Sequence, residues 1–507
     1  MLVIGAGAAG AVVASRVSED PRRRVVLLEA GPDYPLADDL PDDLVNGHDN
    51  SYVDHDWGLQ YEPVGETDRQ DPLPRGKVTG GSSAVNTTIA LRGVPDDFDL
   101  WARLGNPAWA WDEVVAAHNR LERDLDFGHL EHHGDAGPIT IRRWRADELV
   151  PTQAAFIEAA RERGHPACDD VNGLEPHGVG IMAMNKLGRL RISTAVGYLS
   201  AARYRENLEI RAGRNVARLL IEGGRCIGVE TTGGNRIRAR LVVLAAGAIH
   251  TPGVLVRSGV GDRPELDRLG IDPVATMAGV GAGLSDHPAL AVLLEPRFPE
   301  FCAQELPLVQ TICRYTSEPS AHTGGPAYDV NIELITRARD RSGAPLFMLA
   351  ASLEFVEGRG EVRQRSIDPL DPPLIRSGFG IHDTDVSRHV AALRDALDIA
   401  HQPALADFIA NVRFPDSGRS SNDDLVALAR RRSASGYHPC GTARMGPIDE
   451  PGSVVDQYGR CHAVDQLVVA DASIMPTVPR ANINLTSIMI GETIGEWIRT
   501  DPSRYGL

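Results

Sequence analysis

Short apolar runs that alternate with helical patterns are the main feature of the chain, and the first such unit is the most regular. Met1–Ile4 and Val25–Leu28 are continuous apolar runs, as expected for strands buried on both faces of a parallel sheet. Between them, Ala11–Val17 has the composition of a buried helix. This strand–helix–strand order predicts a parallel α/β sheet near the start of the chain.

Two kinds of periodic segment follow. Helical patterns occur at Trp111–Leu125, Glu148–Arg163, Val386–Ala400 and Asp423–Arg431, with Asp385 and Asn422 as predicted N-caps of the last two. Strand patterns occur at Leu208–Ala212, Val216–Ile221, Cys226–Thr231 and Leu241–Ala245. The segment 31–75 is rich in Pro, Asp and Gly, so we expect a long irregular excursion, which inside a domain is usually functional.

A second strand-rich block spans about 291–376 and carries no phosphate-loop signal. Its runs are Leu308–Arg314, Val330–Ile335 and Leu346–Phe355. We interpret this block as a separate sheet that covers a substrate. The chain then closes with an apolar strand, Leu467–Ala470, and a helix, Ile488–Ile498, which can rejoin the first sheet.

Composition and charge narrow the class of partner. With 507 residues, 42% of them hydrophobic, the chain can bury a large core. The net charge of −17 disfavours nucleic acid or an anionic membrane surface as the main partner. No apolar run reaches the roughly 18 residues of a membrane span.

No signal-peptide pattern precedes the first strand, so we expect a cytoplasmic protein, although the shortness of that strand leaves open a start further upstream. The six cysteines form no CxxC pair and are expected to be reduced thiols.

Three glycines after the first strand have the spacing G-x-G-x-x-G. Gly5 permits a tight turn, Gly7 lets the backbone approach a pyrophosphate, and Gly10 lets the helix pack on the strand. The N-terminus of that helix offers free N–H groups to phosphates. Glu29 ends the second strand, where it can accept hydrogen bonds from ribose hydroxyls and disfavours NADP. This strand–turn–helix–strand unit therefore predicts a binding site for a dinucleotide.

Further motifs, spread in order over the chain, identify a family. They are RGKVTGGSSAVN (75–86) with Arg92, Gly93 and Asp99, GAIHTPGVLVRSGVG (247–261), GAGLSDHP (281–288), YHPCGTARMG (437–446), VVADAS (468–473) and PRANINLTSIMIG (479–491). Together with the N-terminal unit they resemble the glucose–methanol–choline (GMC) family of FAD-dependent oxidoreductases. The matches run from residue 1 to about 498.

The resemblance implies an α/β fold, α+β overall, with a Rossmann-like FAD-binding domain and a substrate domain built on an antiparallel sheet. It assigns 1–93, 188–290 and 438–507 to the FAD domain, and 94–187 and 291–437 to the substrate or cap domain. The implied FAD-binding residues are Gly5, Gly7, Ala8, Ala9, Gly10, Glu29, Ala30, Gly76, Gly80, Gly81, Ser82, Asn86, Thr87, Val216, Gly247, Asp471, Ala472 and Asn484. A helix N-cap is a compatible second role for Asp471.

Departures from the family pattern bear on how FAD is held. Some relatives link FAD covalently through a His directly before the Asn of the glycine-rich segment, and here that position is Val85. We therefore expect non-covalent FAD. Thr79, Gly283 and Cys440 also depart from the usual residues, but none of these changes removes a group that the reaction needs.

The reaction that the resemblance implies is oxidation of an alcohol by hydride transfer to flavin N5. His438 matches the active-site His of the family, and histidine is the usual base near neutral pH. Asn482 matches its companion, which is His or Asn in relatives. An amide can donate to the alcohol oxygen but cannot take its proton. We therefore expect His438 to be the base and Asn482 to position the hydroxyl.

Alternatives to this hypothesis stay open. A GMC-type lyase would use the same fold and histidine without net redox chemistry, and a binding or redox-partner flavoprotein would have lost turnover. The electron acceptor of an oxidoreductase could be oxygen, a quinone, a dye-like acceptor or a redox peptide, as in mycofactocin-linked alcohol dehydrogenases. We predict no metal site at Glu131–His132–His133, and we interpret His287 in SDHP as structural.

Overall fold

The computed structural model describes residues 1–63, 69–340, 342–415 and 421–507, and its first sheet is built from strands far apart in the sequence. The members are β1 (Leu2–Ile4), β2 (Val25–Leu28), β11 (Leu208–Arg211), β15 (Val242–Leu244) and β27 (Leu467–Val469). All neighbours are parallel, in the order β11–β2–β1–β15–β27. The predicted parallel sheet and the return of the last strand to it are confirmed.

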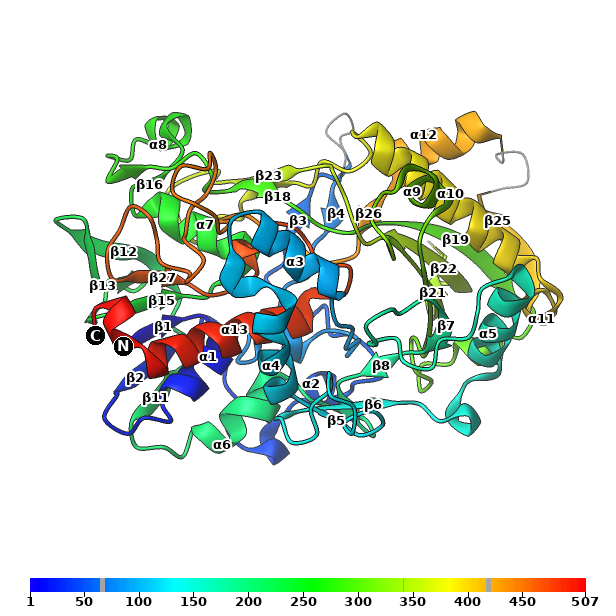
Figure 1. Ribbon diagram of the computed structural model, residues 1–507, viewed down its shortest axis with the longest axis horizontal. Coiled ribbons are helices and arrows are strands. Elements are labelled where there is room, and N and C mark those ends of the chain that lie inside the picture. Colours follow the sequence, from blue (N-terminus) through cyan, green and yellow to red (C-terminus); the bar gives the residue numbers. More distant parts are fainter. Residues whose placement is uncertain (64–68, 341, 416–420) are drawn as a thin grey trace.

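Two helices cover this sheet and pack closely on each other. α1 (Gly10–Val17) follows β1, and α13 (Ile483–Thr500) lies beside it (Figure 1). A Cβ on Gly491 of α13 would lie 2.6 Å from the Ala9 carbonyl oxygen, so only glycine permits this approach. Arg16 of α1 pairs with the fully buried Glu492 at 2.8 Å, which fixes the register of the two helices.

A larger antiparallel sheet lies at the opposite end of the long axis (Figure 1). Its strands are β7 (Gly178–Ile181), β19 (Pro288–Pro296), β20 (Thr311–Tyr315), β21 (Val330–Arg339), β22 (Pro345–Leu353), β25 (Ile409–Phe414) and β26 (Ala434–Ser435). The order is β25–β19–β22–β21–β20–β7, and β26 also pairs with β19. The second sheet expected from the strand-rich block is present.

Alternation of buried and partly buried positions along β19 and β22 gives the sheet two different faces. On β19, Leu290, Val292 and Leu294 are fully buried toward α10 (Asp383–Ala400), whereas Ala289 and Ala291 between them are only partly buried. β22 repeats the pattern. One face of the sheet therefore belongs to the core, and the other is free to line a cavity.

Two predicted helices are shorter than their sequence pattern. α4 spans Trp111–Leu121, and the next three residues form β5 (Glu122–Asp124) instead of a last helical turn. The helix ends early because of a contact with a distant segment: the side chain of Glu122 forms a buried ion pair with Arg92. α5 begins at Pro151, where proline suits the first helical position, and runs to Arg163.

Both predicted N-caps are wrong. α10 begins at Asp383, so Asp385 lies inside the first turn, where its carboxylate accepts from the backbone N–H groups of Glu357 and Gly358. α12 (Asn422–Arg432) is capped by Ser421, whose Oγ accepts from Asp424 N. For α12, Ser421 directly before Asn422 is an equally suitable N-cap, whereas the N-cap residue of α10, His382, makes no side-chain capping bond.

The predicted excursion over 31–75 contains only short elements, and its residues 64–68 lie outside the part that the structure describes. The other helices are α2 (Asp42–Val45), α3 (Pro95–Arg103), α6 (Ser200–Ala202), α7 (Gly247–Arg257), α8 (Arg263–Leu269), α9 (Glu318–Thr323) and α11 (Pro403–Ala406). The other strands are β3 (Gln60–Tyr61), β4 (Asp71–Pro72), β6 (Ile139–Arg143), β8 (Ala183–Met184), β9 (Lys186–Leu187), β10 (Leu190–Arg191), β12 (Val216–Glu222), β13 (Arg225–Thr231), β14 (Arg236–Arg238), β16 (Val260–Gly261), β17 (Ala275–Thr276), β18 (Ala282–Leu284), β23 (Gly360–Arg363) and β24 (Leu374–Arg376).

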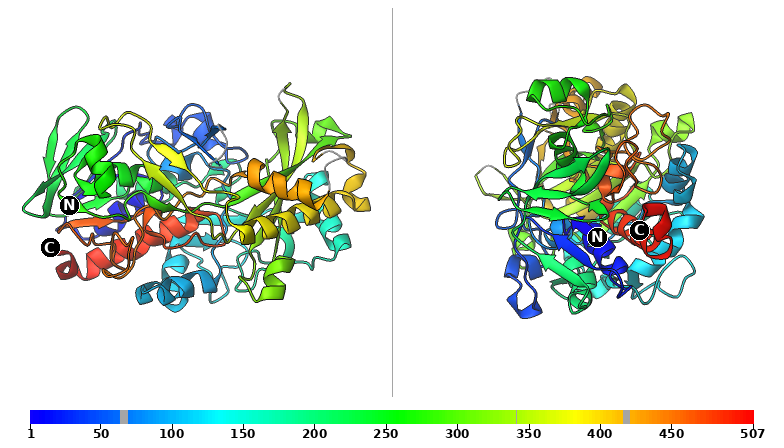
Figure 2. Two further views of the ribbon diagram at one scale, coloured as in Figure 1. Left: turned by 90° about the horizontal axis from the view of Figure 1, so that it is seen from above. Right: turned by 90° about the vertical axis from the view of Figure 1, so that its left-hand side faces the viewer.

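Both ends of the chain lie at the end of the molecule that holds the parallel sheet (Figure 2). Among the helices in the described ranges, none has the length and apolar character that crossing a bilayer requires.

Candidate active site

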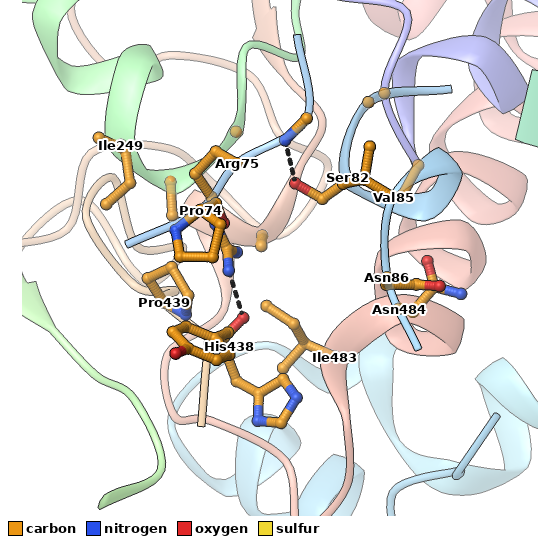
Figure 3. A pocket seen from close by; sticks show the side chains of 18 of the residues that line it. Pro74, Arg75, Ser82, Val85, Asn86, Ile249, His438, Pro439, Ile483 and Asn484 are labelled. Atoms are coloured by element: carbon orange, nitrogen blue, oxygen red, sulfur yellow. Dashed lines mark hydrogen bonds between the residues drawn. The ribbon is translucent and has the colours of Figure 1, made fainter. Parts of the chain in front are cut away.

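A cavity of about 680 Å³ lies between the two sheets, reaching from the carboxyl ends of β1, β2 and β15 to the inner face of the antiparallel sheet. Figure 3 shows part of its wall. Most of the predicted site residues line it, although they come from eight separate stretches of sequence. These residues are Gly5, Gly7, Ala8, Ala9, Glu29, Ala30, Gly76, Gly81, Ser82, Asn86, Thr87, Val216, Gly247, His438, Asp471, Ala472, Asn482 and Asn484. Ligand sites in open α/β sheets are found at this edge.

Gly10 and Gly80 are the two predicted cofactor residues that do not line the cavity. A Cβ on Gly10 would lie 2.0 Å from the Gly5 carbonyl oxygen, so this glycine serves the packing of α1 on β1. Gly80 has a φ of +99°, and its N–H donates to the carbonyl of Ala6 at 2.7 Å. Both glycines therefore support the segments that form the wall, without facing the cavity themselves.

At the glycine-rich segments, backbone atoms and not side chains form the wall of the cavity. Gly5 has a φ of +91°, and a Cβ there would lie 2.4 Å from the Ala245 carbonyl oxygen. A Cβ on Gly81 would lie 2.7 Å from the Cα of Gly7. The two loops therefore touch backbone to backbone at the N-terminus of α1, a geometry suited to phosphates.

Glu29 lies at the end of β2, as predicted, and its carboxyl group is held by the backbone. Oε2 accepts from Ala6 N at 2.9 Å, and Oε1 accepts from Gly31 N at 2.8 Å. Burial raises the pKa of Glu29 to about 7, against the opposing effect of these N–H donors. Each carboxylate oxygen keeps a lone pair free, so the group can also accept from a ligand hydroxyl.

Asp471 is the N-cap of the short helical turn after β27, as its alternative role suggested. Its Oδ1 accepts from Ser473 N, and its Oδ2 accepts from Gly247 N at 2.8 Å and from Thr251 Oγ1 at 2.6 Å. Burial raises the pKa of this carboxyl group. Asp471 thus ties the start of α7 to the strand end where both face the cavity.

Asn86 and Asn484 both line the cavity, and both are labelled in Figure 3. Asn86 Oδ1 accepts from Thr88 N at 3.0 Å. Asn484 Nδ2 is buried and has no hydrogen-bond partner within the described residues. A buried donor without a partner is costly, so the wall offers a position for the acceptor of a ligand. This is what a flavin cofactor with its ring carbonyls and phosphates would supply.

His438 and Asn482 come together although they lie 44 residues apart. The Asn482 Nδ2 atom is 2.9 Å from His438 Nε2, and both side chains line the cavity. Asn482 is the N-cap of α13 but makes no side-chain capping bond, which leaves its amide free for this contact.

Asp286, His287 and Arg75 contact the segment that carries His438. His438 N donates to Asp286 Oδ1 at 2.8 Å, and Arg75 donates to the carbonyl of Tyr437 at 2.8 Å (Figure 3). The Nδ1 atoms of His438 and His287 lie 3.0 Å apart. We interpreted His287 as structural, and the geometry adds this direct contact with His438.

Both imidazoles are neutral near pH 7. Burial, with help from His287 and Arg75, lowers the pKa of His438 well below its usual value of 6.5. Burial also lowers the pKa of His287 to about 4. A neutral His438 is in the protonation state that a general base needs.

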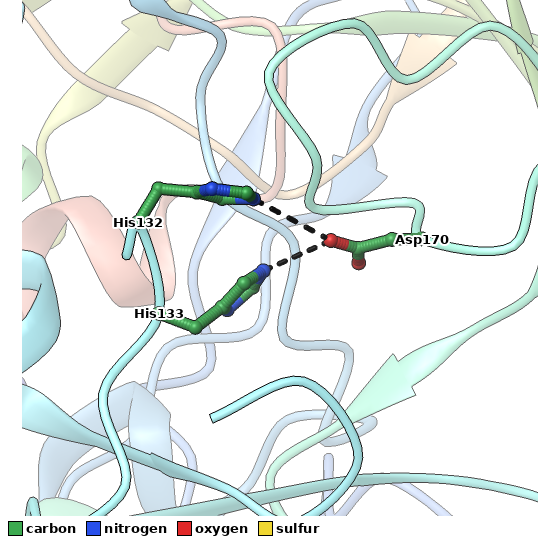
Figure 4. Close-up of side chains that lie close together, drawn as sticks. All are labelled: His132, His133 and Asp170. Carbon is green, nitrogen blue, oxygen red and sulfur yellow. Dashed lines mark hydrogen bonds and ion pairs between the residues drawn. The ribbon is translucent and has the colours of Figure 1, made fainter. Parts of the chain in front are cut away.

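The His132–His133 pair lies outside this cavity, in a buried network of charges (Figure 4). His133 Nδ1 contacts Glu122 at 2.9 Å, and its Nε2 contacts Asp170 at 2.9 Å. The guanidinium of Arg92 bonds Glu122, and that of Arg143 bonds both Asp124 and Asp170. These cations already neutralise the carboxylates, which disfavours a metal ion.

The chain matches family models over most of its length. A GMC oxidoreductase N-terminal model covers residues 1–289, and a GMC oxidoreductase C-terminal model covers 356–491. The mitochondrial choline dehydrogenase of Mus musculus is 33% identical over 99% of this chain and 89% of its own length. An oxygen-dependent choline dehydrogenase of Brucella canis is 31% identical over 98% of this chain and 95% of its own length.

Solved structures agree with this assignment. A pyridoxine 4-oxidase from "Mesorbium loti" superposes with a TM-score of 0.89 at 29% identity, covering 98% of both chains. A formate oxidase of Aspergillus oryzae has a TM-score of 0.88 at 23% identity, covering 99% of this chain and 98% of its own, which supports the fold alone. The protein belongs to the GMC oxidoreductase family. It is an FAD-dependent oxidoreductase that acts on alcohol donors.

Proposed function

We propose that the protein oxidises a carbon that bears a hydroxyl group, with His438 taking the hydroxyl proton and Asn482 positioning the oxygen. The observation that carries this proposal is the 2.9 Å contact between Asn482 Nδ2 and His438 Nε2 in the wall of the cavity. An alcohol oxygen bound at this point can accept from the amide and donate to the imidazole.

The second nitrogen of His438 decides whether the first can accept a proton. A neutral imidazole carries one N–H, so Nε2 is an acceptor only if Nδ1 holds the hydrogen. The Nδ1 atom of His287, 3.0 Å away, can accept that hydrogen in the neutral tautomer of His287 that carries its own hydrogen on Nε2. His287 is therefore proposed as a positioning residue that selects the reactive tautomer of His438.

FAD would be held by the glycine loops, Glu29, Asp471 and Asn484, and when bound it supplies the acceptor for the hydride that leaves the alcohol carbon. The fit is supported by the glycine backbones that face the cavity without side chains and by the amide of Asn484, which has no partner within the described residues.

Val85 lines the cavity at the position where some relatives carry a linking histidine. We propose that FAD is bound without a covalent link. We also propose that 1–93, 188–290 and 438–507 form its domain.

The first test concerns the cofactor. Denaturing the purified yellow protein is expected to release all of its FAD into solution, because Val85 offers no nucleophile. Glu29→Ala is expected to weaken FAD binding by about 1–3 kcal/mol, since the bonds from the ribose hydroxyls are lost. Ultrafiltration after denaturation and a flavin titration of the apoprotein measure the two quantities. Flavin that stays with the precipitated chain would contradict the non-covalent assignment.

The second test uses pH. The rate of flavin reduction by alcohol is expected to rise with pH through one ionisation below pH 6.5 and to be flat above it, because the base must be unprotonated and burial lowers the pKa of His438. Anaerobic stopped-flow measurements across the acid range give the profile. The same ionisation in His438→Ala would place the base elsewhere.

A further inference from the structure

Asp286 is a buried carboxyl group that contacts both histidines of the candidate site. It lies between β18 and β19 and is 3% exposed. Its Oδ1 atom accepts from His287 N and from His438 N, each at 2.8 Å. One oxygen atom therefore holds the main chains of two residues that are 151 apart in the sequence and whose Nδ1 atoms lie 3.0 Å apart.

The hydrogen-bond partners of Asp286 indicate that it is ionised. Its Oδ2 atom contacts Ser435 Oγ, which itself accepts from Tyr437 N at 2.8 Å. Within the described residues Ser435 Oγ has no other acceptor for its hydrogen, so the hydroxyl donates to Asp286. Two N–H groups and one O–H group thus donate to this carboxyl group, which is the pattern of a carboxylate, an acceptor on both oxygens.

The negative charge of Asp286 has no cation bound directly to it. Its contacts within the described ranges are these three donors, none of which is a cationic side chain. Arg75 is close enough for its charge to lower the pKa of Asp286, but its guanidinium donates to the carbonyls of Pro74 and Tyr437. Burial outweighs all these effects and raises the pKa of Asp286. A buried carboxylate without a paired cation is costly, so a positive charge that arises beside it is stabilised.

The other carboxyl groups near the histidine pair do not supply the same charge. Glu354 lies 3.4 Å from His287 Nδ1, but burial raises its pKa to about 8, so it is uncharged in the acid range. Asp97 also raises the pKa of His287, but Arg480 neutralises its charge at 2.7 Å. Burial lowers the pKa of His287, and Asp286 opposes this more strongly than any other charged group.

The remaining titratable groups around His438 do not favour its protonation. Burial lowers the pKa of His438, and His287 and Arg75 add to this effect. The phenol groups of Tyr61 and Tyr437 are neutral, because burial raises the pKa of each. Asp286 is thus the group whose charge can stabilise a proton on the pair of histidines.

We propose that Asp286 is a positioning residue for proton transfer, which holds His438 against His287 and stabilises the positive charge that the pair gains when His438 takes the hydroxyl proton. This inference rests on the proposed function. The O–H bond of the alcohol breaks, an N–H bond forms at His438 Nε2, and Asp286 keeps its charge throughout. Asp286 does not line the cavity, so it acts through His438 and not on the alcohol.

Asp286→Asn tests the charge, because the amide oxygen can still accept from both backbone N–H groups and the amide nitrogen can donate to Ser435 Oγ. Loss of the charge disfavours the protonated imidazole. The ionisation in the rate of flavin reduction should therefore move to lower pH by about 1–3 units. The limiting rate above this ionisation should fall about 10- to 100-fold, because the rate follows the strength of the base. Anaerobic stopped-flow measurements over alcohol concentration and pH give both values, and the FAD content and the affinity for the alcohol should stay unchanged.

A merely structural role would move the pH profile in the opposite direction. A distorted site would admit water, which would raise the pKa of His438 toward its usual value of 6.5 and move the ionisation to higher pH. Asp385→Asn is the matched control. Asp385 is also buried and accepts from the backbone N–H groups of Glu357 and Gly358, but it lies outside the cavity. This variant should leave the rate and the ionisation unchanged.

Ser435→Ala is a second variant, which keeps the charge of Asp286 and removes one of its donors. Its ionisation should stay in place or move to higher pH. An ionisation at the wild-type pH or above it in Asp286→Asn, or one at lower pH in Ser435→Ala, overturns the inference and leaves the proposed function intact. An ionisation that persists in His438→Ala contradicts the proposed base instead, whatever the result for Asp286→Asn.

Discussion

Replacing His438 by alanine is expected to slow flavin reduction by alcohol about 10²- to 10⁴-fold while FAD stays bound. The substitution removes the imidazole nitrogen that lies 2.9 Å from the amide of Asn482. Burial keeps this imidazole unprotonated, so its loss removes the group that takes the hydroxyl proton. Rapid mixing of the holoenzyme with alcohol in the absence of oxygen measures the rate.

Variants of the companion residue serve as matched controls. Asn482→Ala should cost less than His438→Ala, because it removes a hydrogen bond and leaves the proton acceptor in place. Asn482→His should keep partial activity, since an imidazole can also donate to the alcohol oxygen. Flavin reduction at the wild-type rate in His438→Ala would show that the assignment of the base is wrong.

The largest expected loss of stability is for Glu122→Ala, at about 3–5 kcal/mol. Burial alone would raise the pKa of Glu122, but Arg92 and His133 outweigh it and lower the value to about 2. Removing this carboxylate would leave a guanidinium that is 1% exposed without its counter-ion. Urea unfolding of the holoprotein measures the change.

The exposed Glu113 on the preceding helix offers the control for this experiment. Glu113→Ala should change the free energy of unfolding by less than about 0.5 kcal/mol, as for other surface substitutions. Equal effects of the two substitutions would mean that the buried network contributes little to stability.

Local patterns were sufficient to predict the parallel sheet, whereas most of the cofactor residues were expected from the family resemblance and stay a prediction. The runs Met1–Ile4 and Val25–Leu28 became β1 and β2 of that sheet, and Glu29 lies directly after β2, as the sequence predicted. The motif residues gather around one cavity because parallel strands present their carboxyl ends at the same edge.

Features that depend on contacts between distant segments were not predictable. The partnership of His287 with His438 joins residues 151 apart, and nothing near either one signals it. Glu333 occupies an alternating position of β21, and only the assembled sheet shows that this position faces the cavity. The end of α4 was missed for the same reason, since Arg92 draws Glu122 out of the helix.

Anaerobic mixing of the yellow holoenzyme with alcohols, followed by analysis of the product, is the most direct test of the proposed function. We predict that an alcohol bleaches the flavin absorbance and is converted to one equivalent of the aldehyde or ketone, and that His438→Ala loses the bleaching. Conversion of an alcohol without any bleaching, as a lyase would give, would contradict the account, as would flavin that only a chemical reductant can bleach.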